Sequence, residues 1–135
     1  MTRLLIAIMA LMPVGLAQAD NLDGVERMVC AAAQVQICVE SDRCYQATPA
    51  ELDIPEFVVI DTAKKTISTT RASIQNRSTN FTKVDRSDGL IYLQGIESGR
   101  AFSFVIEEAS GHLTAAIARD GIAVSVFGAC TDTKL

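Results

Sequence analysis

The chain has 135 residues, 49% of them hydrophobic, and a formal net charge of −4. A chain of this length forms one domain with a modest core. Its acidic residues are scattered and its basic residues form no cluster, which argues against nucleic acid or an anionic membrane surface as a partner.

Residues 1–19 have the pattern of a cleavable signal peptide. Arg3 precedes an apolar run at 4–11, and the segment ends in Ala-Gln-Ala, the small residues that a signal peptidase reads. The run is shorter than the roughly 20 residues of a spanning helix. We expect cleavage before Asp20 and a single exported domain, 20–135, that is periplasmic or secreted and has no stable membrane insertion. Loss of Arg3 leaves 11 basic against 16 acidic residues, a formal charge of −5.

The N-terminal third of this domain mixes helix and strand signals. Residues 23–33 include Ala, Glu, Arg and Met, which favour a short helix. Residues 35–39 favour a strand, and the polar segment 40–43 turns the chain back. Thr48-Pro49-Ala50-Glu51 has an N-cap residue, proline at the first helical position and an acid three residues after the cap. These features predict at most two short helices, the second of which Pro55 ends.

From residue 57 onward, short β-favouring runs alternate with turn signals, and Asp120-Gly121 is a strong two-residue hairpin signal. Successive short loops favour an antiparallel up-and-down meander in an all-β fold. A sheet with so many strands closes into a β-barrel or a curled sandwich, which also removes exposed edges. The strands are predicted at 57–61, 66–70, 81–85, 90–94, 101–106, 113–119 and 122–127.

Two of these predicted strands define the core. Apolar side chains alternate with small or polar ones in 101–106 and in 122–127, as in a sheet buried mainly on one side. We expect the apolar sides of the two strands to face one core, and these sides are formed by Phe102, Phe104, Ile106, Ile122, Val124 and Val126.

Four cysteines, Cys30, Cys38, Cys44 and Cys130, predict two disulfides, because an even number in a small exported protein forms a disulfide framework. The turn at 40–43 brings Cys38 opposite Cys44. That leaves Cys30 to pair with Cys130. The two lie near the start and the end of the domain, and in a closed meander the first and last strands are neighbours. Two pairings stay open: Cys30–Cys38 with Cys44–Cys130, and Cys30–Cys44 with Cys38–Cys130. The chain has no Cys-x-x-Cys pair, so we expect neither a metal site nor a redox site.

No catalytic arrangement can be assembled from the sequence. His112 is the only histidine, and nothing near it supplies a nucleophile and an orienting acid. Glu107 and Glu108 would point to opposite faces of a strand. We therefore expect no enzyme, no catalytic residue and no cofactor. The longest polar connection, 71–80, contains Arg71, Gln75, Asn76, Arg77 and Asn80. Long loops are where binding surfaces tend to lie, but a solvated connection is the better explanation of these residues.

Two resemblances come from the second half of the chain. Leu-Gln-Gly-Ile-Glu-Ser-Gly-Arg-Ala-Phe-Ser-Phe from Leu93, the closing Phe-Gly-Ala-Cys and the cysteine placement resemble uncharacterised small exported β proteins of proteobacteria over residues 28–131. That resemblance implies no activity. Ser98-Gly99 followed by Phe102 is similar, more weakly, to the Ser-Gly-x-x-Tyr segment of the periplasmic inhibitors of C-type lysozyme, which are small eight-stranded barrels.

These observations lead to a non-enzymatic binding module for a protein or a small ligand of unknown identity. The alternative is an inhibitor that inserts a loop into a cell-wall hydrolase of lysozyme type, because an acidic protein can be steered to a basic lysozyme. Ser98 is the contact expected for the inhibitor, and Ser98 and Arg100 are the candidate binding residues.

Overall fold

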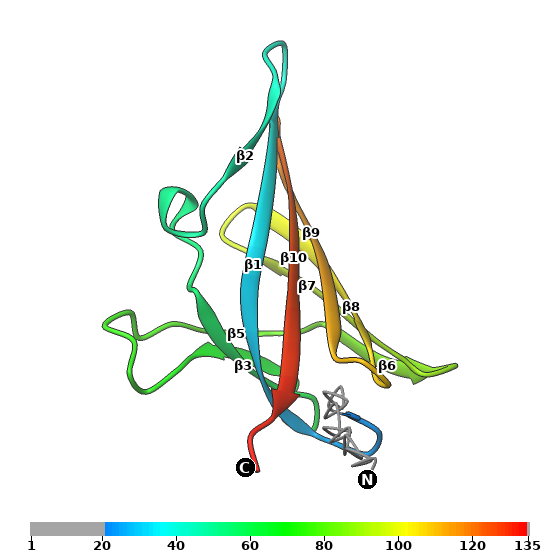
Figure 1. Cartoon of the computed structure of the whole chain (residues 1–135). Coiled ribbons are helices and arrows are strands. Elements are labelled where there is room, and N and C mark those ends of the chain that lie inside the picture. Colours follow the sequence, from blue (N-terminus) through cyan, green and yellow to red (C-terminus); the bar gives the residue numbers. More distant parts are fainter. Residues whose placement is uncertain (1–20, 135) are drawn as a thin grey trace, which may run out of the picture.

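The computed structural model describes residues 21–134, which form one ten-stranded antiparallel sheet and a single 3₁₀ turn, η1 (Ala50–Leu52), with no α-helix among them (Figure 1). The all-β meander predicted from the sequence is confirmed. The strands are β1 (Arg27–Val39), β2 (Cys44–Ala47), β3 (Phe57–Asp61), β4 (Thr66–Thr69), β5 (Ser78–Asn80), β6 (Lys83–Ser87), β7 (Leu90–Glu97), β8 (Arg100–Glu107), β9 (His112–Arg119) and β10 (Ile122–Asp132).

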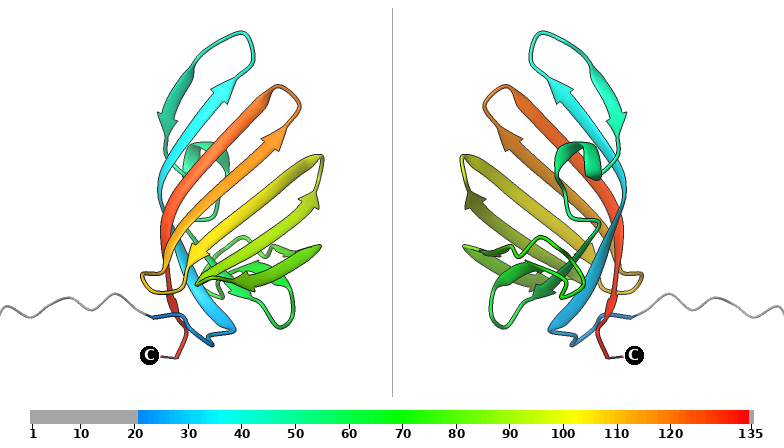
Figure 2. Two further views of the ribbon diagram at one scale, coloured as in Figure 1. Left: turned by 90° about the vertical axis from the view of Figure 1, so that its right-hand side faces the viewer. Right: turned by 90° about the vertical axis from the view of Figure 1, so that its left-hand side faces the viewer.

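The strand order β5-β4-β3-β1-β10-β9-β8-β7-β6 is that of a barrel opened at one seam. Each of these strands pairs with its neighbour along the order, and the seam lies between β5 and β6, which are consecutive in the chain. Figure 2 shows the sheet strongly bent into a half-barrel. The link between β5 and β6 is held to both sides of the seam, because the backbone N–H of Phe81 donates to the carbonyl of Lys65 at 2.8 Å and that of Thr82 to the carbonyl of Gln94 at 2.8 Å.

The helix predicted over 23–33 is wrong, because residues 27–39 form the longest strand of the described chain. β1 pairs with β10 from Met28 to Val39, and its other edge pairs with β3 near one end and with β2 near the other. Strand pairing on both edges satisfies the backbone polar groups of this segment, and that outweighs the small helix preference of its alanines.

The second short helix predicted after Thr48 is the 3₁₀ turn η1. Its capping box forms as expected, because the backbone N–H of Thr48 donates to Oε2 of Glu51 at 2.6 Å. In return, the backbone N–H of Glu51 donates to Oγ1 of Thr48 at 3.4 Å. The segment ends after one turn, with Asp53 in a left-handed conformation at φ 53° and Pro55 just beyond.

The strands predicted after residue 57 lie where expected, with two exceptions. β5 forms at Ser78–Asn80, within the segment 71–80 that was predicted to be a polar connection. The predicted strand 81–85 begins two residues later, at Lys83, because Phe81 and Thr82 form the link between β5 and β6. Phe81 leaves the strand geometry because its ring turns into the core, where it is 4% exposed. There it packs edge-on against Phe102 and Phe104, with ring centroids 5.7 and 5.9 Å away.

The core lines the concave face of the half-barrel. Phe104, Ile106 and Val126 belong to it as predicted, with Phe102 and Val124 packed against it. Ile122, at the start of β10, is only half-buried and lies outside this cluster. Leu22 closes one end of the core and is fully buried, its backbone N–H donating to the carbonyl of Glu108 at 2.7 Å.

Both disulfides are those expected from the hairpin at 40–43. Cys30 and Cys130 are directly opposite each other on β1 and β10, with Cα atoms 4.0 Å apart, and their bond is buried. Cys38 and Cys44 pair across β1 and β2 with Cα atoms 3.9 Å apart. Two disulfides indicate an oxidising, extracytoplasmic environment. No helix within residues 21–134 has the length and apolarity to cross a membrane. The proposed signal peptide, 1–19, lies outside the described residues.

Candidate functional site

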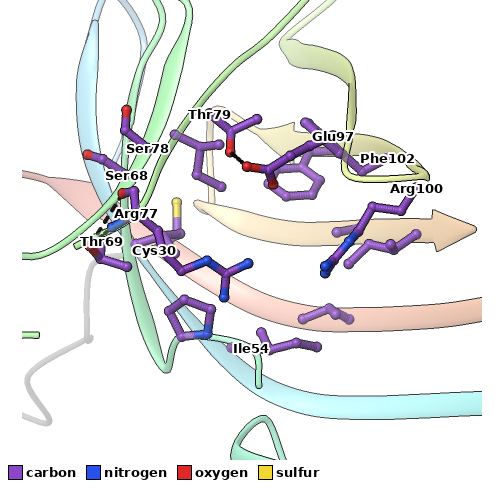
Figure 3. A pocket seen from close by; sticks show the side chains of 18 of the residues that line it. Cys30, Ile54, Ser68, Thr69, Arg77, Ser78, Thr79, Glu97, Arg100 and Phe102 are labelled. Carbon is purple, nitrogen blue, oxygen red and sulfur yellow. Dashed lines mark hydrogen bonds between the residues drawn. The ribbon is translucent and has the colours of Figure 1, made fainter. Parts of the chain in front are cut away.

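A cavity of about 140 Å³ lies against the concave face of the sheet, under the short strands that curl over it (Figure 3). Its wall is apolar because alternate residues of each strand point inward to the core side. The sides of β8, β9 and β10 form one part of this wall and β1, β3 and β4 another. The apolar lining consists of Cys30, Ala32, Ile54, Pro55, Val58, Ile67, Phe102, Phe104, Leu113, Ala115, Ile117 and Val126.

The rim of the cavity is polar and comes from two places in the chain. One side is formed by β4, β5 and the residue after η1, and the other by the β7–β8 hairpin. Two guanidinium groups, two carboxylates and several hydroxyls lie on this rim, from Asp53, Ser68, Thr69, Arg77, Ser78, Thr79, Glu97 and Arg100.

Arg77 is positioned by the loop that connects β4 to β5. The hydroxyl of Thr69 donates to the carbonyl of Gln75 at 2.5 Å and accepts from the backbone N–H of Arg77 at 3.1 Å, which folds the loop back on β4. Nη1 of Arg77 donates to the carbonyl of Asp53 at 3.0 Å and lies 3.7 Å from the carboxylate oxygen Oδ2 of that residue. The loop therefore holds its arginine at the cavity rim.

Arg100 is the first residue of β8 and stands directly opposite Glu97 of β7. The two side chains do not form an ion pair. Oε1 of Glu97 instead accepts from the hydroxyl of Thr79 at 2.5 Å. Nε of Arg100 is buried and has no hydrogen-bond acceptor among residues 21–134. In Figure 3, the guanidinium groups of Arg77 and Arg100 extend into the cavity from opposite sides.

The structure separates the two binding residues proposed from the sequence. Arg100 lines the cavity, whereas Ser98 is exposed in the β7–β8 turn with a left-handed φ of 48°. Sequence reasoning missed the cavity, and it identified Arg77 only as one member of a polar connection. The arginine was visible in that connection, but the pattern contained no signal that the loop folds back onto the concave face.

The β8–β9 turn brings together a serine, a glutamate and the single histidine, but not in a catalytic order. The hydroxyl of Ser110 donates to the carboxylate of Glu107, not to the imidazole. Nδ1 of His112 lies 4.0 Å from the same carboxylate, and the His112 side chain is 79% exposed. A general base must be within hydrogen-bond reach of its nucleophile. The hydroxyl and the carboxylate therefore form a turn on the surface, since Ser110 Oγ also accepts from the His112 backbone N–H at 3.2 Å.

The arrangement is suited to binding. Within the described part of the chain, no three His, Cys, Asp or Glu side chains come close enough to hold a metal ion. The concave cavity with its polar rim combines an apolar wall with a buried polar atom, Nε of Arg100, that has no partner among residues 21–134. Comparisons of the chain with models of protein families, with curated proteins and with solved structures gave no match.

Proposed function

We propose that this protein is an exported, non-enzymatic binding module, periplasmic or secreted, that holds a small and largely apolar ligand in the concave cavity. The observation that carries the proposal is an apolar cavity with an open polar rim. Pockets of this composition, in the mouths of curled or closed sheets, are typical small-molecule sites. The two disulfides support export, because such bonds persist in oxidising compartments.

The size of the cavity limits the ligand. Its volume of about 140 Å³ is close to that of an engineered apolar cavity of about 150 Å³ that binds benzene. The enclosed part of the ligand is therefore a single ring or a short alkyl chain. A longer molecule would extend through the open rim.

Titration of the purified, oxidised protein with octan-1-ol tests this function. We expect shifts of the methyl resonances of Leu113, Ala115 and Ile117, which line the cavity, in ¹H–¹³C spectra. The methyl groups of Ala116 and Ala118 are exposed, and their signals should not move. Uniform small shifts, or shifts only at the exposed methyl groups, would contradict a cavity ligand.

Filling the cavity gives a matched pair of variants. Ala115→Leu adds side-chain volume inside the cavity, and Ala116→Leu adds the same volume to the exposed neighbour. We expect the first variant to lose octan-1-ol binding and the second to keep it. Ile117→Phe provides a second cavity-filling variant if Ala115→Leu does not fold, with dispersion of the amide spectrum as the criterion for folding.

The second candidate function is inhibition of a lysozyme-type hydrolase. It is supported by the exposed β7–β8 turn, which carries Ser98, and by the acidic net charge of −4. An excess of the protein should then inhibit lysis of cell walls by a C-type lysozyme, and Ser98→Trp should abolish the inhibition. Undiminished lysis at equimolar and tenfold excess would exclude this alternative.

A further inference from the structure

We propose that the cavity selects a carboxylate. The ligand class is a small monocarboxylic acid with an apolar alkyl or aryl body, whose carboxylate is bound by Arg100 with help from Arg77. This inference rests on the proposed function, because it names the ligand of the same cavity. Four features carry it: the unpaired donor of Arg100, the second guanidinium, the positions of the two rim carboxylates, and the apolar floor.

Arg100 carries a buried hydrogen-bond donor without an acceptor. Its Nε has no partner within residues 21–134, although the side chain projects to the cavity rim. A buried polar group left without a partner is unfavourable because it has lost its water and gained no other acceptor. Native structures usually satisfy such groups. Nε itself is enclosed by protein, so a ligand oxygen in the cavity would meet the Nη groups at the end of the side chain, which extend into the cavity (Figure 3). The planar guanidinium presents donors in a fork that matches the two oxygens of a carboxylate.

Arg77 adds a second guanidinium from the opposite side of the cavity (Figure 3). One of its nitrogens, Nη1, is engaged by Asp53 through the carbonyl at 3.0 Å and the carboxylate at 3.7 Å. A guanidinium has five N–H donors, so donors remain for a ligand. The hydroxyl of Thr69 holds the backbone at Arg77, and the hydrogen bond to Asp53 holds its side chain, which reduces the entropy lost when a ligand binds.

The two carboxylates on the rim leave Arg100 available. Glu97 directs Oε1 to the hydroxyl of Thr79, and no carboxylate of the described chain lies within ion-pair distance of Arg100. Asp53 is 80% exposed and lies beside Arg77. Its ion pair with Arg77 is weak because exposed charges are well solvated. A ligand carboxylate therefore meets one guanidinium without a counter-ion and one with only a solvated counter-ion.

The floor below the arginines determines the rest of the ligand. It is formed by the rings of Phe102 and Phe104 and by the aliphatic side chains of β9 and β10. An alkyl or aryl body gains about 25 cal/mol for each Å² that it removes from water. A doubly charged or strongly hydrated anion, such as inorganic phosphate, would leave this floor unused. The chemistry of the site thus fits a singly charged group attached to a short apolar body.

The test compares three ligands with the same eight-carbon chain: octanoate, octan-1-ol and octylamine. Dissociation constants come from the titration of cavity methyl resonances of the purified, oxidised protein at fixed ionic strength. We expect octanoate to bind at least about tenfold more tightly than octan-1-ol, because charge-assisted hydrogen bonds are the strong ones. Octylamine should bind more weakly than the alcohol.

Substitution of the arginine tests its role directly. Arg100→Gln should weaken octanoate binding about tenfold and thereby remove the preference of the cavity for octanoate over octan-1-ol. Arg100→Lys keeps the charge without the fork and should give an intermediate affinity. Arg119→Gln is the matched control. It removes the same charge from the exposed end of β9, outside the cavity lining, and should change neither affinity.

The outcomes distinguish this inference from the proposed function. If octan-1-ol shifts the cavity resonances and octanoate binds no more tightly, the cavity binds apolar ligands and the carboxylate assignment is wrong. Tighter binding of octylamine would mean that Glu97 dominates the rim and would also overturn it. If no ligand moves the cavity resonances, the proposed function itself fails. If Arg100→Gln does not fold, the affinities of the unmodified protein for the three ligands still test the carboxylate assignment.

Discussion

Three phenylalanines from distant parts of the chain form one cluster at the base of the cavity. Phe81 comes from the β5–β6 link, and Phe102 and Phe104 come from β8. Their ring centroids lie 5.7–5.9 Å apart, with Phe81 edge-on to both partners. Aromatic pairs at such distances add about 0.5–1.5 kcal/mol beyond their burial. The cluster links the two sides of the half-barrel across the seam, so it supports both the fold and the cavity wall.

Truncating a ring in this cluster should be strongly destabilising. Phe104 is 9% exposed, and Phe104→Ala removes its contacts with Phe81 and Phe102. We expect the free energy of unfolding, from urea titration, to fall by about 3–5 kcal/mol. Phe57→Ala is the control, because Phe57 is 48% exposed. A loss below about 1 kcal/mol for Phe104→Ala would be incompatible with a core position.

A second prediction at this scale concerns Glu51. The backbone N–H and the hydroxyl of Thr48 donate to its carboxylate and lower its pKa below the usual 4.5. The ionised form is favoured in the folded state. Its contribution to stability is therefore present above the unfolded-state pKa and disappears as the pH falls through the lowered folded-state pKa. An NMR pH titration of the Glu51 carboxyl carbon should show the lowered pKa, and Thr48→Ala should raise it towards 4.5. The backbone N–H of residue 48 is kept in this variant, so an unchanged midpoint would contradict the contribution of the Thr48 hydroxyl.

At the level of elements, the two-residue turns set the pairing of β6 to β10. The β6–β7 and β7–β8 turns both have positive φ at two successive residues, Asp88-Gly89 and Ser98-Gly99. Turns of this kind match the twist of the strands that they join. The β8–β9 turn is different. There Gly111 lies against the last strand, and its carbonyl accepts from the backbone N–H of Cys130 at 2.7 Å.

Replacement of two glycines by alanine separates backbone strain from close packing. Gly99 and Gly111 have φ of 75° and 72°, so alanine is about equally strained at both, by roughly 1–2 kcal/mol. An added Cβ meets nothing within 4 Å at Gly99 but would lie 2.2 Å from the carbonyl oxygen of Cys130 at Gly111. Gly111→Ala should therefore lose about 1–3 kcal/mol more unfolding free energy than Gly99→Ala. Equal losses in thermal or urea unfolding would show that Gly111 has no such close contact.

The two disulfides join elements at very different separations in the chain. Cys30 and Cys130 are 100 residues apart, and Cys38 and Cys44 only 6. In the chain-entropy model the longer link stabilises by about 4–5 kcal/mol and the shorter by about 2 kcal/mol. Replacing Cys30 and Cys130 by alanine should therefore lower the melting temperature much more than replacing Cys38 and Cys44. Equal shifts in differential scanning calorimetry would contradict this ranking.

For the whole molecule, β1 and β10 form the central pair of the sheet and carry the buried disulfide between them. The described chain ends beside this pair, because the backbone N–H of Thr133 donates to the carbonyl of Arg27 at 3.4 Å. The central pair of strands, β1 with β10, therefore forms only when β10, the last strand of the described chain, is present. The disulfide then fixes the two ends of the domain together.

Export is the prediction that belongs to this scale. Cleavage after Ala19 should leave a protein whose N-terminal sequence starts with Asp20. The described chain packs on the fold almost from its first residue, since Leu22 is fully buried and its backbone N–H donates to the carbonyl of Glu108 at 2.7 Å. Edman sequencing or intact mass measurement of the protein from the producing cells checks the site. Full-length protein recovered from the cytosol would contradict export.

Much of the architecture was predictable because its signals are local. The strands at 57–61, 90–94 and 101–106 follow from alternation, and the hairpin at Asp120-Gly121 follows from turn chemistry. The pairing of Cys38 with Cys44 follows from one short turn. At the site, Arg100 was proposed because of its place beside the Ser-Gly turn, yet nothing in the pattern indicated that it faces a cavity.

By itself, the sequence determined the all-β class, because alternation and turn residues act between near neighbours. It also indicated the core-facing side of the strands at 101–106 and 122–127 and favoured, among three possible pairings, the two disulfides that form. Only the tertiary structure decided that residues 27–39 form a strand, since their partners in β10 lie about a hundred residues away. The tertiary structure also determined where the cavity lies and which residues form its rim. Its rim joins Arg77, held by a loop contact to Asp53, with Arg100, left unpaired because Thr79 engages Glu97. Such contacts between distant segments depend on how the sheet curls, and no local pattern encodes that curvature.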